Sequence, residues 1–233
     1  MAKSRKVFGC LIIGVLGLIV AAALVVLLGV WSIGKAGPSL AEDQIETRTG
    51  FDASIGSTDF SLFGAELKVT DFVVQNPSAF GEDRAFFDLK DFYMDTSLGK
   101  AVTAAQGGKI NLSELNVHLA NVTLVRNEEG KVNALVFSEG FGAAEEEAPP
   151  EEEAPPVEYL IENMHIKIDT ITAVDQRSGV KKTWEVNIDE TYQDVDDVKQ
   201  VLDPLMSKFK GMGLDFVSQY VVASLANIDT YTG

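Results

Sequence analysis

From residue 51 onward, apolar and polar residues alternate in several short segments, which is typical of β-strands with one apolar and one polar face. The phase of the alternation changes at Thr70-Asp71 and at Ala120-Asn121, where we expect β-bulges that bend and twist the sheet. The pattern predicts a curved, mostly antiparallel β-sheet. The alternating apolar positions are Leu67, Val69, Leu115, Val117, Leu119, Ile166, Ile168, Trp184, Val186 and Ile188.

Turn-forming residues separate these segments, and two of the turns connect stretches that are suited to hairpins. We expect Leu124-Val125 to pair with a returning strand over Ala134–Phe137. We also expect Ile171–Val174 to pair with a returning strand over Thr183–Ile188. Both hairpins would extend the same sheet.

The C-terminal region changes to a helical spacing, with apolar residues three and four positions apart. Asp203-Pro204 fits an N-cap followed by proline at the first helical position, so we expect the helix to restart there. Gly211 would end it, Leu214–Ile228 would form a second helix, and the acidic run Asp194–Asp197 would lie at a helix N-terminus, where the helix dipole favours negative charge. The apolar stripe consists of Val195, Val198, Leu202, Leu205, Phe209, Met212 and Phe216.

The N-terminal region has an uncharged apolar run from Val7 to Ile33, directly after three cationic residues. About 20 apolar residues are enough to cross a bilayer as a helix, whereas the apolar core of a signal peptide has only 7–15. We therefore expect an uncleaved, single-pass transmembrane helix. Because cationic flanks stay in the cytoplasm, the N-terminus would be inside and the rest of the chain outside.

A glutamate- and proline-rich segment, AAEEEAPPEEEAPP, divides the exported part of the chain. It has no large apolar residue, so we interpret it as a solvated, extended linker. The alternative is a docking tail for a basic partner. The predicted organisation is a cytoplasmic stub and anchor over 1–36, a first β-rich half over 37–142, the linker over 143–156, a second β-rich segment over 157–194 and amphipathic helices over 195–233. The fold class is α+β.

An apolar sheet face must be covered, and the sequence leaves three possibilities open. The C-terminal helices could plug the face to form an ordinary core. Part of the face could instead stay open as a groove for lipid chains, or Phe216–Leu225 could lie on the membrane or on a partner. If there is a groove, the candidate lining residues are Leu115, Val117, Leu119, Ile166 and Ile168.

Catalytic motifs are missing from the sequence. His118 and His165 fall on the polar side of their segments, and neither belongs to a metal-binding or nucleophile motif. The exported part has no cysteine, and the net charge of −16 disfavours electrostatic binding to nucleic acid and to anionic lipid headgroups. The sequence indicates a protein that is not an enzyme, with no catalytic residue, cofactor or metal.

The order of segments resembles the AsmA-like envelope proteins of Gram-negative bacteria, in particular their short, single-unit members. The resemblance runs from about Phe51 to Leu205 and includes the turn Asn76–Phe80 and the segment Gly130–Leu135. Ala79 and Ala134 stand where the family has glycine and leucine. The resemblance implies structural turns, with no catalytic residues, at Asn76, Pro77, Gly130 and Asn133.

The resemblance also implies a place and a role. It implies a single-pass inner-membrane protein with its domain in the periplasm, which takes part in phospholipid transport or maintenance of the cell envelope through an apolar β-sheet groove. One unit spans too few strands to join two membranes, so it would act with further copies of itself or with larger envelope proteins. The alternative is a non-catalytic structural or assembly subunit that docks to partner proteins.

Overall fold

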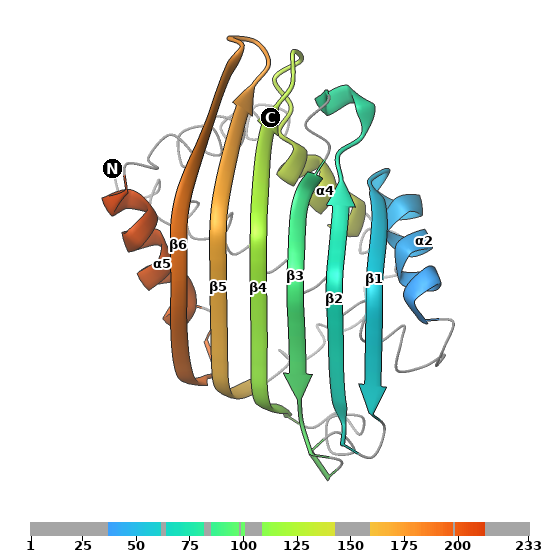
Figure 1. The fold of residues 1–233 in the computed structure, drawn as a ribbon, viewed down its shortest axis with the longest axis vertical. Coiled ribbons are helices and arrows are strands. Elements are labelled where there is room, and N and C mark those ends of the chain that lie inside the picture. The colour runs from blue at the N-terminus through green and yellow to red at the C-terminus, as the bar shows by residue number, and fades with distance from the viewer. Residues whose placement is uncertain are drawn as a thin grey trace, which may run out of the picture.

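The computed structural model describes residues 37–61, 64–81, 85–97, 99–100, 109–142, 159–197 and 199–212. These residues form one sheet with short helices on one side of it (Figure 1). The elements are α2 (Gly37–Thr49), β1 (Asp52–Ser61), β2 (Glu66–Gln75), the 3-10 helix η2 (Ser78–Phe80), β3 (Ala85–Asp95), β4 (Ile110–Arg126), α4 (Asn133–Gly142), β5 (Tyr159–Asp175), β6 (Val180–Val195) and α5 (Lys199–Gly211).

The sheet has six strands in sequence order, β1-β2-β3-β4-β5-β6. All neighbours are antiparallel except β4 and β5, which run parallel from Ile110↔Tyr159 to Arg126↔Asp175. The predicted α+β class with a mostly antiparallel sheet is therefore confirmed. The predicted hairpin of Ile171–Val174 with Thr183–Ile188 is present as β5 and β6, since Ile171 pairs with Trp184.

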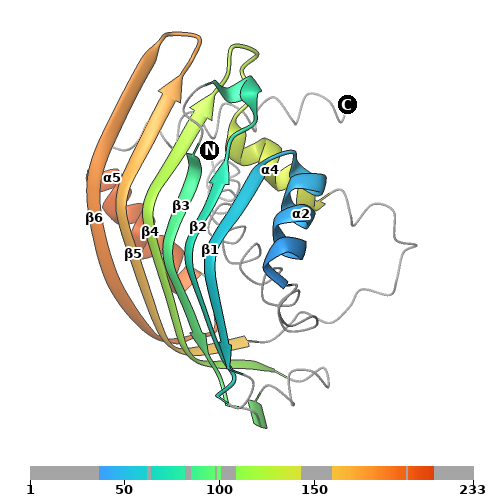
Figure 2. The same ribbon diagram turned by 45° about the vertical axis from the view of Figure 1, so that its right-hand side comes forward.

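The regular pairing of the strands is interrupted along one line that crosses the whole sheet. Asp71 and Asn187 have φ angles of 53° and 44° on this line. On β2 the core-facing side changes across it, from Leu67 and Val69 to Phe72 and Val74. Irregularities of this kind bend and twist a strand, so their alignment explains the curvature that Figure 2 shows. Both predicted bulges belong to this bend line, which passes through Gly56, Asp71, Lys90, Ala120, Asp169 and Asn187.

The described helices lie on the concave side of the sheet (Figure 2). α2 packs along β1, and α4 lies across the end of the sheet where β1 begins. Phe137 of α4 contacts Phe51, Phe86 and Phe87 through ring pairs whose centroids lie 5.1–6.2 Å apart. α5 packs beside β6 at the opposite edge, and its residues Val201, Leu202 and Leu205 belong to the same hydrophobic core.

The predicted strand over Ala134–Phe137 is wrong, because these residues belong to α4. Only a single bridge, between Arg126 and Val132, continues the hairpin. The cause is Asn133, whose side-chain Oδ1 accepts hydrogen bonds from the backbone N–H groups of Val125 and Ala134. This side chain occupies the donor of β4 that a returning strand would need, and the chain turns into a helix.

The first predicted C-terminal helix is present, with two corrections. It does not restart at Asp203-Pro204, since α5 continues through Pro204 to Gly211. Val195 ends β6 and lies outside the helix, and the Asp197 carboxylate accepts a hydrogen bond from the Lys199 N–H at the helix start. The predicted placement of acidic residues before a helix is confirmed. Val198, Phe216 and the second helix over Leu214–Ile228 lie outside the described residues.

Three further predictions concern the anchor, the linker and the C-terminal segment. These segments, Val7–Ile33, 143–156 and Phe216–Leu225, lie outside the described residues. Within the described part of the chain, no helix combines the length and the apolar character needed to cross a bilayer.

Candidate functional site: the concave face of the sheet

The five predicted lining residues lie side by side on two neighbouring strands. Val117 of β4 pairs with Ile166 of β5, and Leu119 pairs with Ile168. Leu115 pairs with Met164, a residue that the sequence reasoning omitted. Because the two strands are parallel and in register, the alternation along each strand places all these side chains on one face.

These side chains are buried. Leu115, Val117, Leu119, Ile166 and Ile168 are 3%, 4%, 1%, 0% and 3% exposed. They belong to one hydrophobic core that extends from β1 to β6 and includes residues of the described helices. The concave face is thus continuous and apolar, and the lining residues are inside the protein in this conformation.

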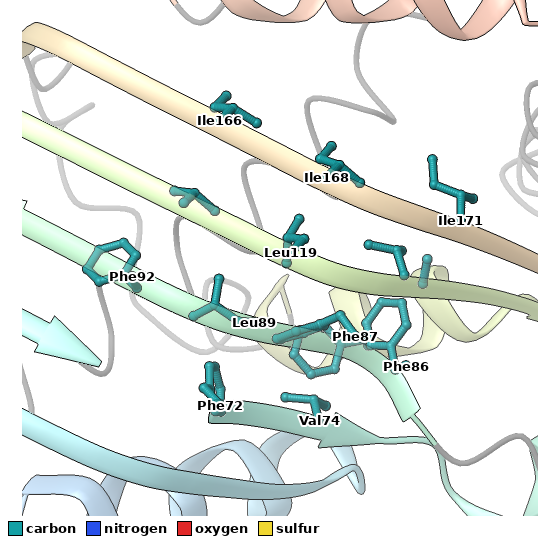
Figure 3. Packing of buried hydrophobic residues seen from close by; sticks show 14 of the residues in the cluster. Phe72, Val74, Phe86, Phe87, Leu89, Phe92, Leu119, Ile166, Ile168 and Ile171 are labelled. Carbon is teal, nitrogen blue, oxygen red and sulfur yellow. The ribbon is translucent and has the colours of Figure 1, made fainter. Parts of the chain in front are cut away.

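The central part of the face also includes β3, which the sequence reasoning did not assign to it. Figure 3 shows Leu89 and Phe92 of β3 beside Leu119, Ile166 and Ile168. Leu89 and Phe92 are 2% and 3% exposed. The signal for them was in the sequence, since Phe87 and Leu89 alternate with charged residues and Phe92 and Met94 continue on the other phase.

Two buried polar atoms interrupt the apolar surface. Among the residues that the structure describes, Thr58 Oγ1 and Tyr192 OH are buried without a hydrogen-bond partner. Burial raises the pKa of Tyr192 above its ordinary value. Both residues follow the core-facing alternation of β1 and β6, so one unpaired hydroxyl lies on each edge strand. Such groups are uncommon in proteins, because an unpaired buried donor has lost its bond to water.

Asn76 and Asn133, two of the four predicted turn residues, form a buried polar cluster at one end of the sheet. Asn133 Nδ2 donates to Asn76 Oδ1 at 2.8 Å and to the Thr123 carbonyl oxygen at 2.7 Å. Asn76 and Asn133 are 1% and 0% exposed. Pro77 precedes η2, and Gly130 has a φ angle of 89° in the turn after β4. These hydrogen bonds and turns connect the ends of β2 and β4.

The convex face carries the two histidines, as their position in the alternation predicts. His118 Nε2 lies 2.9 Å from Asp169 Oδ2, and His165 Nε2 lies 2.7 Å from Asp189 Oδ1. These pairs lie beside a row of register partners that runs next to the bend line across all six strands. This convex belt consists of Ser57, Thr70, Asp91, His118, Lys167 and Asp189.

His118, which belongs to the belt, and His165, which lies beside it, each have a carboxylate partner on the next strand. The hydrogen bond from His165 is the largest cause that lowers the pKa of Asp189 below its ordinary value of 3.8. No nucleophilic side chain is paired with a histidine in these contacts. The pairs join neighbouring strands beside the bend line, which is a structural role.

A metal site is not formed by the described residues, because no three histidine, cysteine, aspartate or glutamate side chains among them are grouped for one ion. The comparisons with known proteins add nothing to this picture. No family model, no curated protein and no solved structure matches this chain.

Proposed function

We propose that this chain is a single-pass inner-membrane protein, anchored by Val7–Ile33, whose periplasmic domain handles phospholipid in the cell envelope. The observation that carries the proposal is the continuous apolar concave face, which crosses all six strands of a curved sheet. A curved apolar surface of this kind fits acyl chains, because it offers contact area without hydrogen-bonding groups. The N-terminal apolar run would keep this surface next to a bilayer.

The unpaired hydroxyls on the two edge strands support the same proposal. Tyr192 OH is a hydrogen-bond donor inside an apolar surface, and among the described residues nothing accepts its bond. An ester or phosphate oxygen of a phospholipid is an acceptor that would travel with an acyl chain. Because the lining residues are buried in this conformation, acyl chains would reach them by displacing the protein segments that cover them.

Site-specific photocrosslinking tests the proposal on the full chain in its membrane. In two separate variants, a photoreactive amino acid replaces Val117 or Ile168, which are 4% and 3% exposed on the concave face. The same amino acid replaces Asn116 on the convex face as the matched control, one residue away on the same strand. After irradiation, the purified protein is analysed by mass spectrometry for a covalent phospholipid adduct.

We expect the adduct at position 117 and at position 168, and none at position 116. A lipid adduct of equal yield at positions 116 and 117 would reflect general contact with the membrane. Adducts within the protein chain alone at both concave positions would contradict lipid handling, since they would mean that no lipid enters the face.

A second function, a structural or assembly subunit, is favoured by a specific observation. All five candidate lining residues share one buried core with Val201, Leu202 and Leu205 of α5. A face filled by the chain's own side chains needs no ligand, and the domain would then act by docking to partner proteins. The crosslinking experiment separates the two functions, because a filled core yields only adducts within the chain.

A further inference from the structure

The tip of the β5–β6 hairpin combines an exposed apolar residue with a group of cations. Val180, the first residue of β6, is 56% exposed and is one of two exposed large hydrophobic residues in the described part of the chain. Arg177, Lys181 and Lys182 lie within three positions of it in the sequence, and all three are exposed. No acidic residue occurs between Gln176 and Trp184.

This group of cations differs from the rest of the chain, because the net charge of the whole chain is −16. The nearest carboxylate in the sequence, Asp175, is 5% exposed and binds the Arg126 guanidinium at 2.7 and 3.1 Å. It therefore offers little charge to the solvent at the tip. The turn after β4 adds Glu128 and Glu129, of which Glu129 is paired with its neighbour Lys131.

The tip also continues the concave face to its end. Val180, Lys182 and Trp184 have the same place in the alternation as the buried residues Val186 and Ile188. Lys182 Nζ lies 4.7 Å from the centre of the Trp184 ring, over which it packs. A half-buried indole beside exposed cations is an arrangement suited to a bilayer interface, where the ring enters the headgroup region and the cations meet phosphates.

Strand pairing and hydrogen bonds hold the tip of the hairpin in a defined conformation. The strand pairing extends to the last residues, Asp175↔Val180, and Gly179 closes the turn with a φ angle of 68°. The Asp175 carboxylate also accepts hydrogen bonds from the Ser178 hydroxyl and the Arg177 N–H. The tip therefore needs little ordering when it binds, which favours docking.

We propose that the β5–β6 hairpin tip docks the domain onto the surface of an anionic phospholipid bilayer. Arg177, Lys181 and Lys182 bind the phosphate groups, and Val180 enters the interface between headgroups and acyl chains. Docking would place the end of the concave face against the lipid. It requires no lipid transfer, and it rests on the proposed function only for the membrane anchor.

The test uses the fluorescence of Trp184 in the full chain. The chain has two tryptophans, and Trp31→Phe leaves Trp184 as the only one. The protein is held by its apolar run in nanodiscs of phosphatidylcholine, and separate vesicles that carry brominated lipid are added. Bromine quenches an indole only at short range, so quenching reports that the tip has entered the added bilayer.

We expect quenching by brominated vesicles that contain phosphatidylglycerol, and little by vesicles of phosphatidylcholine alone. The variant R177Q/K181Q/K182Q should bind about 100-fold more weakly, from roughly fivefold for each cation near an anionic surface. The control K90Q/K199Q/K210Q removes three exposed cations elsewhere and should leave binding unchanged. Val180→Ser should reduce the quenching at saturation, and unchanged circular dichroism spectra would show that the variants are folded.

Three results would overturn the proposal. The first is equal emission with all vesicles, and the second is an equal loss of binding in the tip variant and in the control. The third is that the tip binds an acidic protein segment in place of a bilayer, for example the six glutamates of residues 143–156. If Lys182 is protected from amine-modifying reagents without vesicles, and glutamine at those six positions removes the protection, the tip binds that segment and not a bilayer.

Discussion

Asn133 is the single residue on which one end of the core most depends. Its amide makes four hydrogen bonds inside the protein, to Asn76 Oδ1, to the Thr123 carbonyl, and from the N–H groups of Val125 and Ala134. These bonds join the turn after β2, the end of β4 and the start of α4. A buried amide that satisfies all its neighbours also fixes their relative positions, because any other side chain leaves several groups unpaired.

Asn133→Ala should therefore lower the free energy of unfolding by about 3 kcal/mol, because it leaves buried donors and acceptors without partners. Urea unfolding followed by circular dichroism measures the change. The control is Asn163→Ala, since Asn163 is exposed and its amide donates one bond of 3.3 Å to the Ser113 carbonyl. That variant should stay within about 0.5 kcal/mol of the parent. Equal losses would mean that Asn133 has no special role.

Asp189 predicts a dependence of stability on acid pH. Its pKa is lower in the folded protein than its ordinary value of 3.8, mainly through the hydrogen bond from His165. The unfolded chain thus takes up the proton first as the pH falls. The contribution of Asp189 to stability is complete above its ordinary pKa and is lost as the pH falls through its folded pKa.

The variant Asp189→Asn provides the comparison. The difference in urea midpoint between the parent and this variant should be constant near neutral pH and should shrink below pH 3.8. Asp59→Asn, a change at an exposed position of β1, serves as the control. A difference between parent and Asp189→Asn that is the same at neutral and at acid pH would contradict the linkage.

At the scale of the elements, the bend line determines how the strands curve around the concave face. Gly56 on β1 lies opposite Asp71 on β2, where the left-handed φ angle of 53° turns the Asp71 side chain toward its neighbour. A Cβ atom at Gly56 would lie 2.8 Å from the Asp71 Cβ and 3.2 Å from the Thr70 carbonyl oxygen. The absence of a side chain at Gly56 is what allows the two strands to approach at the bend.

Gly56→Ala should lower the free energy of unfolding by about 2 kcal/mol, because the added methyl group has no room beside Asp71. Asp71→Gly removes the opposing Cβ and the strain of a left-handed aspartate, so the same Gly56→Ala change should be less damaging in that background. Gly99→Ala is the control, since a Cβ there meets nothing within 4 Å. Additive effects in the double variant would show that the two positions do not interact.

The elements also show what the sequence can and cannot predict. Alternation predicted the core-facing sides of β2, β4 and β5 and both bulges, because burial of one face imposes a period of two. The short run Ala134–Phe137 fits a strand and a helix equally well, and the amide of Asn133 decides for the helix. The parallel pairing of β4 and β5 was not predicted, because it depends on which edge of the sheet β5 reaches after the acidic segment.

For the whole molecule, the decisive property is how firmly the concave face is covered. The sequence predicted which side chains share this face, and the structure adds that they are 0–4% exposed within one core. Alternation alone could not give this result, because it identifies a sheet face but not what covers it. Burial in this conformation and access for acyl chains are compatible only if the cover can open at a moderate free energy.

A charge placed on the face measures the strength of that cover. Ile168→Asp and Val117→Asp put a carboxylate where the parent side chains are 3% and 4% exposed. We expect each to lower the free energy of unfolding by more than about 3 kcal/mol, because a buried, unpaired carboxylate loses its hydration. Asn163→Asp adds the same charge at an exposed position of β5 and should change it by less than about 0.5 kcal/mol.

The same variants connect stability to lipid. A phospholipid that binds only the folded protein raises its melting temperature with lipid concentration, whatever segment it displaces. The parent and Asn163→Asp should show this rise in detergent solution. Val117→Asp should not, because an acyl chain packed against its carboxylate would remove the water that hydrates the charge. A melting temperature that is independent of phospholipid in the parent, together with a large loss in Val117→Asp, would mean that the face is a permanent core. The protein would then act by docking to its partners, since a core that never opens cannot carry lipid.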